Sequence, residues 1–218
     1  MLLYYITDRS QFDGDEAARR SRLLVTIAES ARCGVDYVQL REKDLSAREL
    51  ETLAREVQLR TENQKLRTVF LINSRTDIAW ACGGQGVHLP ANDISPSEVR
   101  KIWSAPGRLT IGASCHTRTE VARARQEGAD FAVFGPVFEK AGARPAGLDA
   151  LREACQEKIP VLALGGVTLE NAESCMQAGA AGIAAIRLFQ DTEMDGVVAA
   201  LREIGRRRPG FRPQPVQG

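Results

Sequence analysis

Short apolar runs recur along the chain and alternate with longer segments whose apolar residues have helical spacing. Eight runs are rich in aliphatic, β-branched or aromatic residues, as strands are. They are Leu2–Thr7, Tyr37–Arg41, Thr68–Asn73, Gly86–Leu89, Thr110–Ser114, Phe131–Phe134, Val161–Leu164 and Gly182–Ile186. Between them, apolar side chains lie three or four residues apart, for example at Leu23, Ile27 and Ala31. The pattern predicts eight successive strand–helix units.

Capping residues mark where several of the predicted helices begin. Ser46, Ser95 and Thr117 each precede a helical segment, and Pro96 stands at a first helical position. Thr117 and Glu120 have the spacing of a capping box. These signals agree with the helix boundaries that the apolar pattern predicts.

Strict alternation of strands and helices indicates a parallel sheet, and the strands are apolar on both faces, as burial on both sides requires. Eight units of about 27 residues each use nearly the whole chain. We therefore predict an α/β fold, a (β/α)8 TIM barrel, as a single domain over residues 1–205. A doubly wound open sheet is the alternative, because alternation alone does not prove closure. Residues 206–218 are basic and Pro-rich and are interpreted as a flexible tail, with anion contact as the alternative.

The composition is that of an ordinary globular protein, and it argues against several classes of partner and site. The net charge of +1 gives no argument for nucleic acid or a membrane surface as partner. No apolar run approaches the roughly 20 residues that span a bilayer. The five cysteines are scattered without a C-x-x-C pair, which argues against a zinc site or a disulfide framework. We expect a cytoplasmic protein that acts on a small molecule, with a homo-oligomer left open.

Polar residues gather at the predicted strand ends, where barrels of this kind place their catalytic groups. Gln39, Arg41 and Lys43 alternate along the second strand, which predicts one common side for all three. The two cations suit a phosphorylated or carboxylated substrate. The alternative is that they are rim residues paired with Glu42 and Asp44.

The third, fourth and fifth strands end in further polar groups. Asn73 ends the third strand, His88 lies in the fourth with Asp93 beyond it, and the fifth ends at Ser114, Cys115 and His116. His88 has an alternative interpretation as a buried hydrogen-bonding residue. A Cys115–His116 nucleophile is disfavoured, because adjacent strand residues point to opposite faces.

A glycine pair follows the seventh apolar run and indicates an anion site. Gly165 and Gly166 end that run, and a helical segment and the eighth run come next. Glycines let backbone N–H groups approach an anion closely, and a following helix N-terminus adds a positive dipole end. Barrels commonly bind phosphate in the loops after strands seven and eight.

An ordered set of segments resembles the thiamin phosphate synthase/TenI family over about residues 2 to 203. The set reads YITDR, YVQLREKD, LINSRTDIA, GVHLP, IGASCHT, EGADFAVFGPVF, LALGGVT and AGAAGIAAI, spread from residue 5 to residue 186. The family has a (β/α)8 barrel, in agreement with the strand count. Its synthases join a hydroxymethylpyrimidine pyrophosphate to a thiazole phosphate, through loss of pyrophosphate from a carbocation-like pyrimidine.

The resemblance implies roles for individual residues. Gln39, Arg41 and Lys43 match residues that bind the pyrimidine pyrophosphate, Asn73 a pyrimidine contact, and Ser114 a group near the reacting centre. Gly166, with Gly165 beside it, and the backbone of Ala185 and Ile186 match the cradle of the thiazole phosphate.

The chain also departs from the synthases. They hold Mg²⁺ with two aspartates, but the first position is Ser74 here, and only Asp93 matches the second. Their Thr-x-Thr-Lys loop over the pyrophosphate is replaced by residues 139–145, EKAGARP, in which Lys140 or Arg144 could substitute in part. A pyrophosphate leaving group needs its developing charge neutralised. These losses indicate the TenI-like branch.

Three hypotheses follow from the resemblance. The leading one is a thiazole tautomerase-like isomerase that binds thiazole phosphate and needs no cofactor. Its acid–base group would be His116, His88 or Cys115, because Pro136 stands where a tautomerase carries a histidine. The alternatives are a thiamin phosphate synthase, a transferase that uses Mg²⁺, and a non-catalytic binder of thiamin intermediates.

Overall fold

The computed structural model describes residues 1–62, 67–105, 107–139, 142 and 144–207, with the side chains of 61 and 62 excepted. Its strands form one closed parallel barrel in chain order, and β1 closes the ring by pairing with β8, where Leu2 lies opposite Gly182. The strands are β1 (Leu2–Ile6), β2 (Tyr37–Leu40), β3 (Val69–Asn73), β4 (Gly86–Leu89), β5 (Thr110–Cys115), β6 (Phe131–Phe134), β7 (Val161–Leu164) and β8 (Gly182–Ala185). The predicted barrel is confirmed, and the open sheet is excluded.

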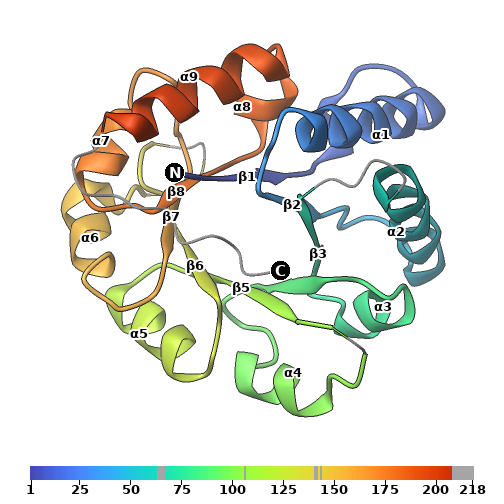
Figure 1. Cartoon of the computed structure of the whole chain (residues 1–218), viewed down its shortest axis with the longest axis horizontal. Coiled ribbons are helices and arrows are strands. Elements are labelled where there is room, and N and C mark those ends of the chain that lie inside the picture. The colour runs from blue at the N-terminus through green and yellow to red at the C-terminus, as the bar shows by residue number, and fades with distance from the viewer. Residues whose placement is uncertain (63–66, 106, 140–141, 143, 208–218) are drawn as a thin grey trace.

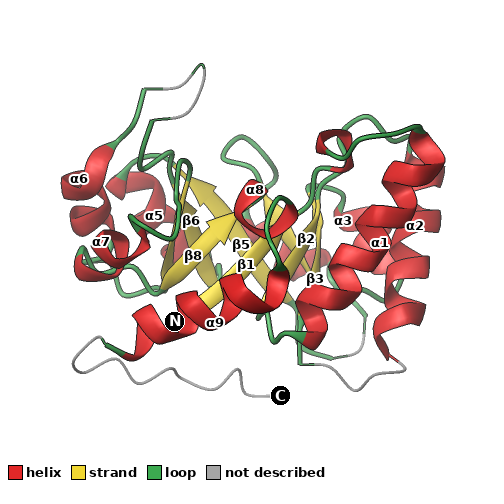
Figure 2. Ribbon diagram, turned by 90° about the horizontal axis from the view of Figure 1, so that it is seen from above, coloured by secondary structure: helices red, strands yellow, loops and turns green. Residues whose placement is uncertain are grey.

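Helices surround the barrel in the order of the chain (Figure 1), so that the strands lie inside a helical layer (Figure 2). They are α1 (Glu16–Arg32), α2 (Ala47–Glu62), α3 (Thr76–Ala81), α4 (Pro96–Ile102), α5 (Arg118–Gln126), α6 (Gly147–Ala154), α7 (Ala172–Gln177), α8 (Arg187–Gln190) and α9 (Met194–Arg206), with a 3-10 turn η1 (Arg9–Gln11). Within the described ranges, no helix has both the length and the apolar character needed to cross a membrane.

The predicted helix caps are present, with one difference. Ser95 and Glu98 form a complete capping box at the start of α4. The Thr117 side chain accepts a hydrogen bond from the Glu120 N–H at the start of α5. The Glu120 carboxylate, however, accepts from the backbone N–H of His116 at 2.5 Å. Glu120 therefore ties α5 to the end of β5.

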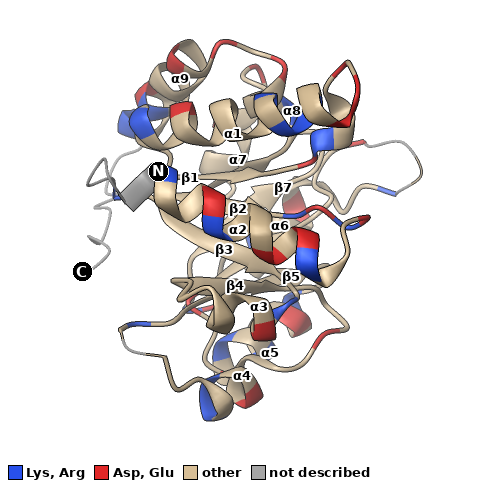
Figure 3. Cartoon of the chain, turned by 90° about the vertical axis from the view of Figure 1, so that its right-hand side faces the viewer, with Lys and Arg blue, Asp and Glu red and all other residues tan. Residues whose placement is uncertain are grey.

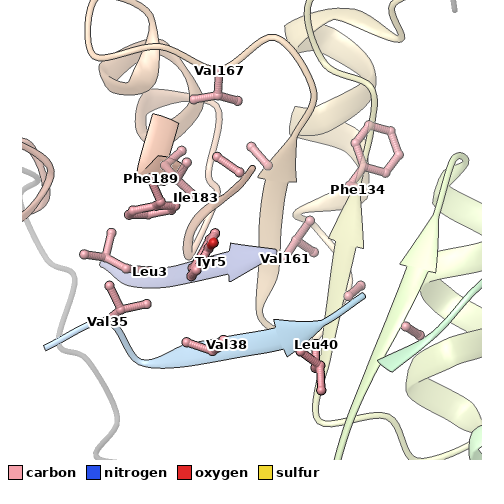
Figure 4. Close-up of a cluster of buried hydrophobic side chains, with 14 of the residues drawn as sticks. Leu3, Tyr5, Val35, Val38, Leu40, Phe134, Val161, Val167, Ile183 and Phe189 are labelled. Carbon is pink, nitrogen blue, oxygen red and sulfur yellow. The ribbon is translucent and has the colours of Figure 1, made fainter. Parts of the chain in front are cut away.

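Two apolar layers hold the barrel together. The outward faces of the strands pack against the helices, as Figure 4 shows for Tyr5 of β1, Ile183 of β8 and Phe189 of α8. The inward faces form a smaller cluster around Tyr4 and Phe131, whose rings meet edge to face at 5.4 Å between centroids. Basic and acidic residues are interspersed over the helices (Figure 3). The filled interior leaves the strand ends as the place for chemistry.

Candidate active site

Four consecutive strands place polar side chains at one side of the barrel interior. Gln39 of β2 donates through Nε2 to Asn73 Oδ1 of β3 at 2.7 Å. His88 Nε2 of β4 lies 2.8 Å from Ser114 Oγ of β5. Asn73 and His88 are register partners across β3 and β4, so the two hydrogen-bonded pairs lie on neighbouring strands. The structure therefore brings together four of the residues that the sequence singled out.

His88 is a buried, neutral histidine. Only 2% of the residue is exposed, and burial, reinforced by the positive charge of Arg41, lowers the pKa of its imidazole to about 3. Gly112 leaves room for the ring, because a Cβ there would lie 2.8 Å from His88 Nδ1. Nδ1 itself has no hydrogen-bond partner among the described residues. The alternative interpretation of His88 as a buried hydrogen-bonding residue is confirmed, and its partner Ser114 is a candidate site residue.

Arg41 and Lys43 lie just beyond the end of β2. The strand ends at Leu40, so Lys43 stands on a turn and is exposed, and the predicted strand alternation does not reach it. The backbone N–H of Arg41 donates to Thr7 Oγ1 at 2.9 Å. In the described part of the chain, no carboxylate lies within ion-pair distance of either cation. The two acids that could have paired with them, Glu42 and Asp44, bind Arg9 instead.

His116 and Cys115 end β5 with different surroundings. The His116 ring lies with Nδ1 2.5 Å from the carbonyl oxygen of Gly135, and the residue is exposed. Nδ1 must therefore carry the proton, which leaves Nε2 as the basic nitrogen. Cys115 is buried toward the helices, and burial raises the pKa of its thiol to about 12. A thiol in that state is a poor nucleophile.

The glycine pair after β7, the predicted anion site, adopts left-handed backbone conformations. Gly165 and Gly166 have φ angles of 92° and 65°, which L side chains rarely adopt. Gly165 also packs against the β6–α6 loop, because a Cβ there would lie 2.6 Å from Pro136 Cα. Asn171 closes the loop by donating to the Gly166 carbonyl at 2.9 Å and accepting from the Thr168 N–H at 2.8 Å.

Backbone donors are left free at the ends of β7 and β8. Among the described residues, nothing accepts a hydrogen bond from the N–H of Gly165, Gly166 or Ile186. Ala185 ends β8 with its side chain buried, and Ile186 precedes α8. Free N–H groups at adjacent strand ends are the donors that a phosphate needs.

The residues at the implied metal position fit a partly supplied Mg²⁺ site. Asp93 Oδ2 is buried without a hydrogen-bond partner among the described residues, while Oδ1 accepts from the Ile94 N–H. Ser74 has a φ angle of 64°, a left-handed conformation that suits Asn or Asp better than Ser. Mg²⁺ is commonly held by one or two carboxylates together with substrate phosphates. Asp93 supplies one carboxylate, which is the smaller of these two numbers.

A cavity adjoins the candidate site. A cavity of about 440 Å³ lies between the β4–α4 loop and α5, and Asp93, Ser114 and Glu120 are among its lining residues. Lys140 lies outside the described residues. From the sequence, no role was assigned to Thr7 or Arg9, although both follow the first strand, where such a role is expected, and Glu42 was considered only as a partner of Arg41 and Lys43.

Comparison with known proteins gives one consistent family. The thiamine monophosphate synthase family, TMP-TENI, matches residues 3–189. A putative thiamine-phosphate synthase 2 from Aquifex aeolicus is 40% identical over 191 residues, covering 86% of this chain and 96% of the relative. A putative thiamine-phosphate synthase from Geobacter sulfurreducens is 43% identical over 189 residues, covering 84% of both chains.

A solved structure agrees with the sequence relatives. The thiamine phosphate pyrophosphorylase from Pyrococcus furiosus superposes with a TM-score of 0.79 at 29% identity, covering 94% of this chain and 95% of that one. The family match spans the barrel from β1 to α8 and therefore includes every strand end described above. The chain belongs to the thiamine monophosphate synthase family, as its ordered segments led us to expect.

Proposed function

We propose that the protein is a thiamin-phosphate synthase, a transferase that joins a hydroxymethylpyrimidine pyrophosphate to a thiazole phosphate. The names of the relatives support this transferase better than the isomerase that the sequence favoured. The observation that carries the proposal is the pair of unpaired cations, Arg41 and Lys43, next to the Gln39–Asn73 pair. A tautomerase has no leaving group whose developing charge two cations would have to neutralise.

The pyrimidine pyrophosphate would bind at the ends of β2 and β3. Gln39 has a buried, unpartnered Oε1, which can accept a hydrogen bond from an amino group on the pyrimidine. Arg41 and Lys43 would bind the pyrophosphate and stabilise the charge that develops as it leaves. Asp93 would hold Mg²⁺, which would supply further neutralisation of the charge on the leaving group.

The thiazole phosphate would bind across the barrel, at the ends of β7 and β8. The free N–H groups of Gly165, Gly166 and Ile186 would hold its phosphate. The carbon–oxygen bond to pyrophosphate breaks, and the thiazole nitrogen lone pair forms the new carbon–nitrogen bond. Ser114, oriented by neutral His88, would supply a hydroxyl near the reacting centre.

A thiazole tautomerase is the second candidate, because one observation favours it. The position of the first metal-binding aspartate is the uncharged Ser74, and a proton shift requires no metal. His116 would then be the acid–base group, since its Nε2 is free while Nδ1 is held by Gly135. His88 is disfavoured for this role, because burial lowers its pKa to about 3.

Two assays on the purified protein separate the candidates. The first supplies the pyrimidine pyrophosphate, thiazole phosphate and Mg²⁺ and measures thiamin phosphate. The second supplies the non-aromatic thiazole carboxylate phosphate alone and measures its aromatisation. We expect product only in the first assay. Product only in the second would replace the transferase with the isomerase, and silence in both would leave a binding protein.

A further inference from the structure

A buried arginine stands at the centre of a charge cluster beside the proposed anion site. Arg9 opens the 3-10 turn after β1, and only 5% of the residue is exposed. Its Nη1 and Nη2 donate to the two oxygens of Asp44 at 2.7 and 2.8 Å. Nη1 also donates to Glu42 Oε2 at 3.1 Å, and Nε donates to Glu16 Oε1 at 2.7 Å. All three guanidinium nitrogens therefore donate to carboxylates.

The Glu42 carboxylate is buried and held by residues that follow β1. The residue is 5% exposed, and its oxygens accept from the Thr7 hydroxyl at 2.5 Å and the Arg9 N–H at 3.0 Å. Thr7 Oγ1 in turn accepts from the Arg41 N–H. These contacts fix the backbone at Arg41 and turn the Glu42 side chain toward Arg9.

The sequence Arg41-Glu42-Lys43-Asp44 alternates in charge and could neutralise itself. Opposite charges about 4 Å apart near a protein surface attract strongly enough to compete with a bound anion. The Arg9 hydrogen bonds lower the pKa of Asp44, so this acid is ionised at neutral pH. Without Arg9, its negative charge would have Arg41 and Lys43 as the nearest cations in the sequence.

We propose that Arg9 is a positioning residue that draws Glu42 and Asp44 away from Arg41 and Lys43, and so keeps both cations free for a pyrophosphate group. This inference rests on the proposed function, because it needs an anion site at those cations. It gives the buried network a role in substrate affinity beyond its role in folding.

The experiment measures binding of inorganic pyrophosphate by calorimetry to the full chain and its variants, with the unfolding temperature of each. Arg9→Gln should weaken binding about tenfold, the scale of one carboxylate competing for a cation. Asp44→Asn alone should change binding little, since Arg9 already neutralises that acid. The double variant Arg9→Gln/Asp44→Asn should recover most of the affinity. Arg20→Gln, which removes a surface pair with Glu56, is the matched control and should bind as the original chain does.

Recovery in the double variant separates the inference from a purely structural role. In the Arg9→Gln background both Arg9–Asp44 hydrogen bonds are already lost, so Asp44→Asn removes only a negative charge, and a purely structural loss would persist instead of recovering. If Arg9→Gln fails to fold, Arg9→Lys keeps the charge but loses the bidentate fork, and the same recovery by Asp44→Asn is expected. Unchanged binding in the folded Arg9 variant, or a loss that Asp44→Asn does not relieve, would overturn the inference.

One further variant distinguishes this inference from the proposed function. Arg41→Gln should lose pyrophosphate affinity if the anion site is where we propose. A loss in Arg41→Gln without one in Arg9→Gln would leave the proposed function standing and refute the role of Arg9. Unchanged binding in Arg41→Gln would refute the anion site itself, and the role of Arg9 with it.

Discussion

The two sides of the barrel mouth present different chemical groups. The ends of β2 to β5 present side chains, with Gln39 bonded to Asn73 and His88 bonded to Ser114. The ends of β7 and β8 present backbone, with N–H groups at Gly165, Gly166 and Ile186 that have no acceptor in the described part of the chain. One side can therefore be tuned by exchanging a functional group, whereas the other depends on conformations that favour glycine.

The difference predicts different kinds of failure. A substitution on the β2–β5 side removes a functional group and should affect catalysis more than folding. A substitution at the glycines should strain the backbone and affect folding and phosphate binding together. The following variants test this contrast, in order of decreasing expected effect.

The largest effect is expected from Gly165→Ala. The residue has a φ angle of 92°, and the new Cβ would lie 2.6 Å from Pro136 Cα. We expect a loss of about 3 kcal/mol in the free energy of unfolding, from backbone strain and steric overlap together. Gly83→Ala is the control, because its φ of 67° is equally left-handed but no atom lies within 4 Å. Its loss should be about 1 kcal/mol. Urea unfolding measures both, and equal losses would show that packing against Pro136 does not matter.

Arg41→Gln should give the next largest effect, on catalysis alone. Removing a cation that stabilises the leaving pyrophosphate should lower kcat/KM of the transferase about a hundredfold. The urea midpoint should stay the same, because in the described chain the Arg41 side chain has no ion pair to lose. Arg55→Gln removes an exposed arginine paired with Glu51 and should keep full activity. A drop in stability as large as the drop in activity would erase the contrast between the two sides.

His88 should make stability depend on pH. The pKa of its imidazole is about 3 in the folded chain and 6.5 in the unfolded chain. Between these two pH values, the unfolded state therefore binds a proton that the native state does not bind. Stability should therefore fall as pH drops from 6.5 toward 3, at up to about 1.4 kcal/mol per pH unit. Between pH 7 and 5, the original chain should lose about 2 kcal/mol more than His88→Asn.

Ser114→Ala is the control for that measurement. It removes the hydrogen bond to His88 but not the burial that lowers its pKa, so the pH dependence should persist. If His88→Asn shows the same pH dependence as the original chain, other groups carry it.

Ser74→Asp should give the smallest effect, and a gain. The residue has a φ angle of 64°, which Asp tolerates, and a second carboxylate would join Asp93 near the metal. We expect Mg²⁺-dependent synthase turnover to rise about fivefold. Ser74→Asn relaxes the backbone in the same way without adding charge and should give no gain. An equal gain from both variants would assign the effect to the backbone.

Local patterns in the sequence were sufficient to predict the architecture. The alternation of apolar runs with helical spacing predicted three strands with the observed bounds, such as Phe131–Phe134, and the other five differ by one residue at an end. Barrel closure did not follow from that pattern, because an open sheet has the same alternation. The family resemblance favoured closure, and the pairing of β1 with β8 demonstrated it.

The site residues were predictable by type and strand but not by contact. Gln39, Asn73, His88 and Ser114 could be named because polar residues stand out at the ends of apolar strands. Their pairing depends on the register between neighbouring strands, and the sequence of a single strand does not determine that register. The predicted strand alternation over Gln39, Arg41 and Lys43 does not extend to Lys43, because β2 ends at Leu40 and Lys43 lies in a turn.

The sequence by itself determined the periodicity, the capped helices, the glycine pair and the polar strand ends, because each depends on residues close together in the chain. The tertiary structure decided which charges meet. Glu42 and Asp44 stand beside Arg41 and Lys43 in sequence, yet both bind Arg9, more than 30 residues away. The parallel pairing of β1 with β2 brings the ends of these two strands together, and burial there favours the arginine fork that binds both carboxylates at once.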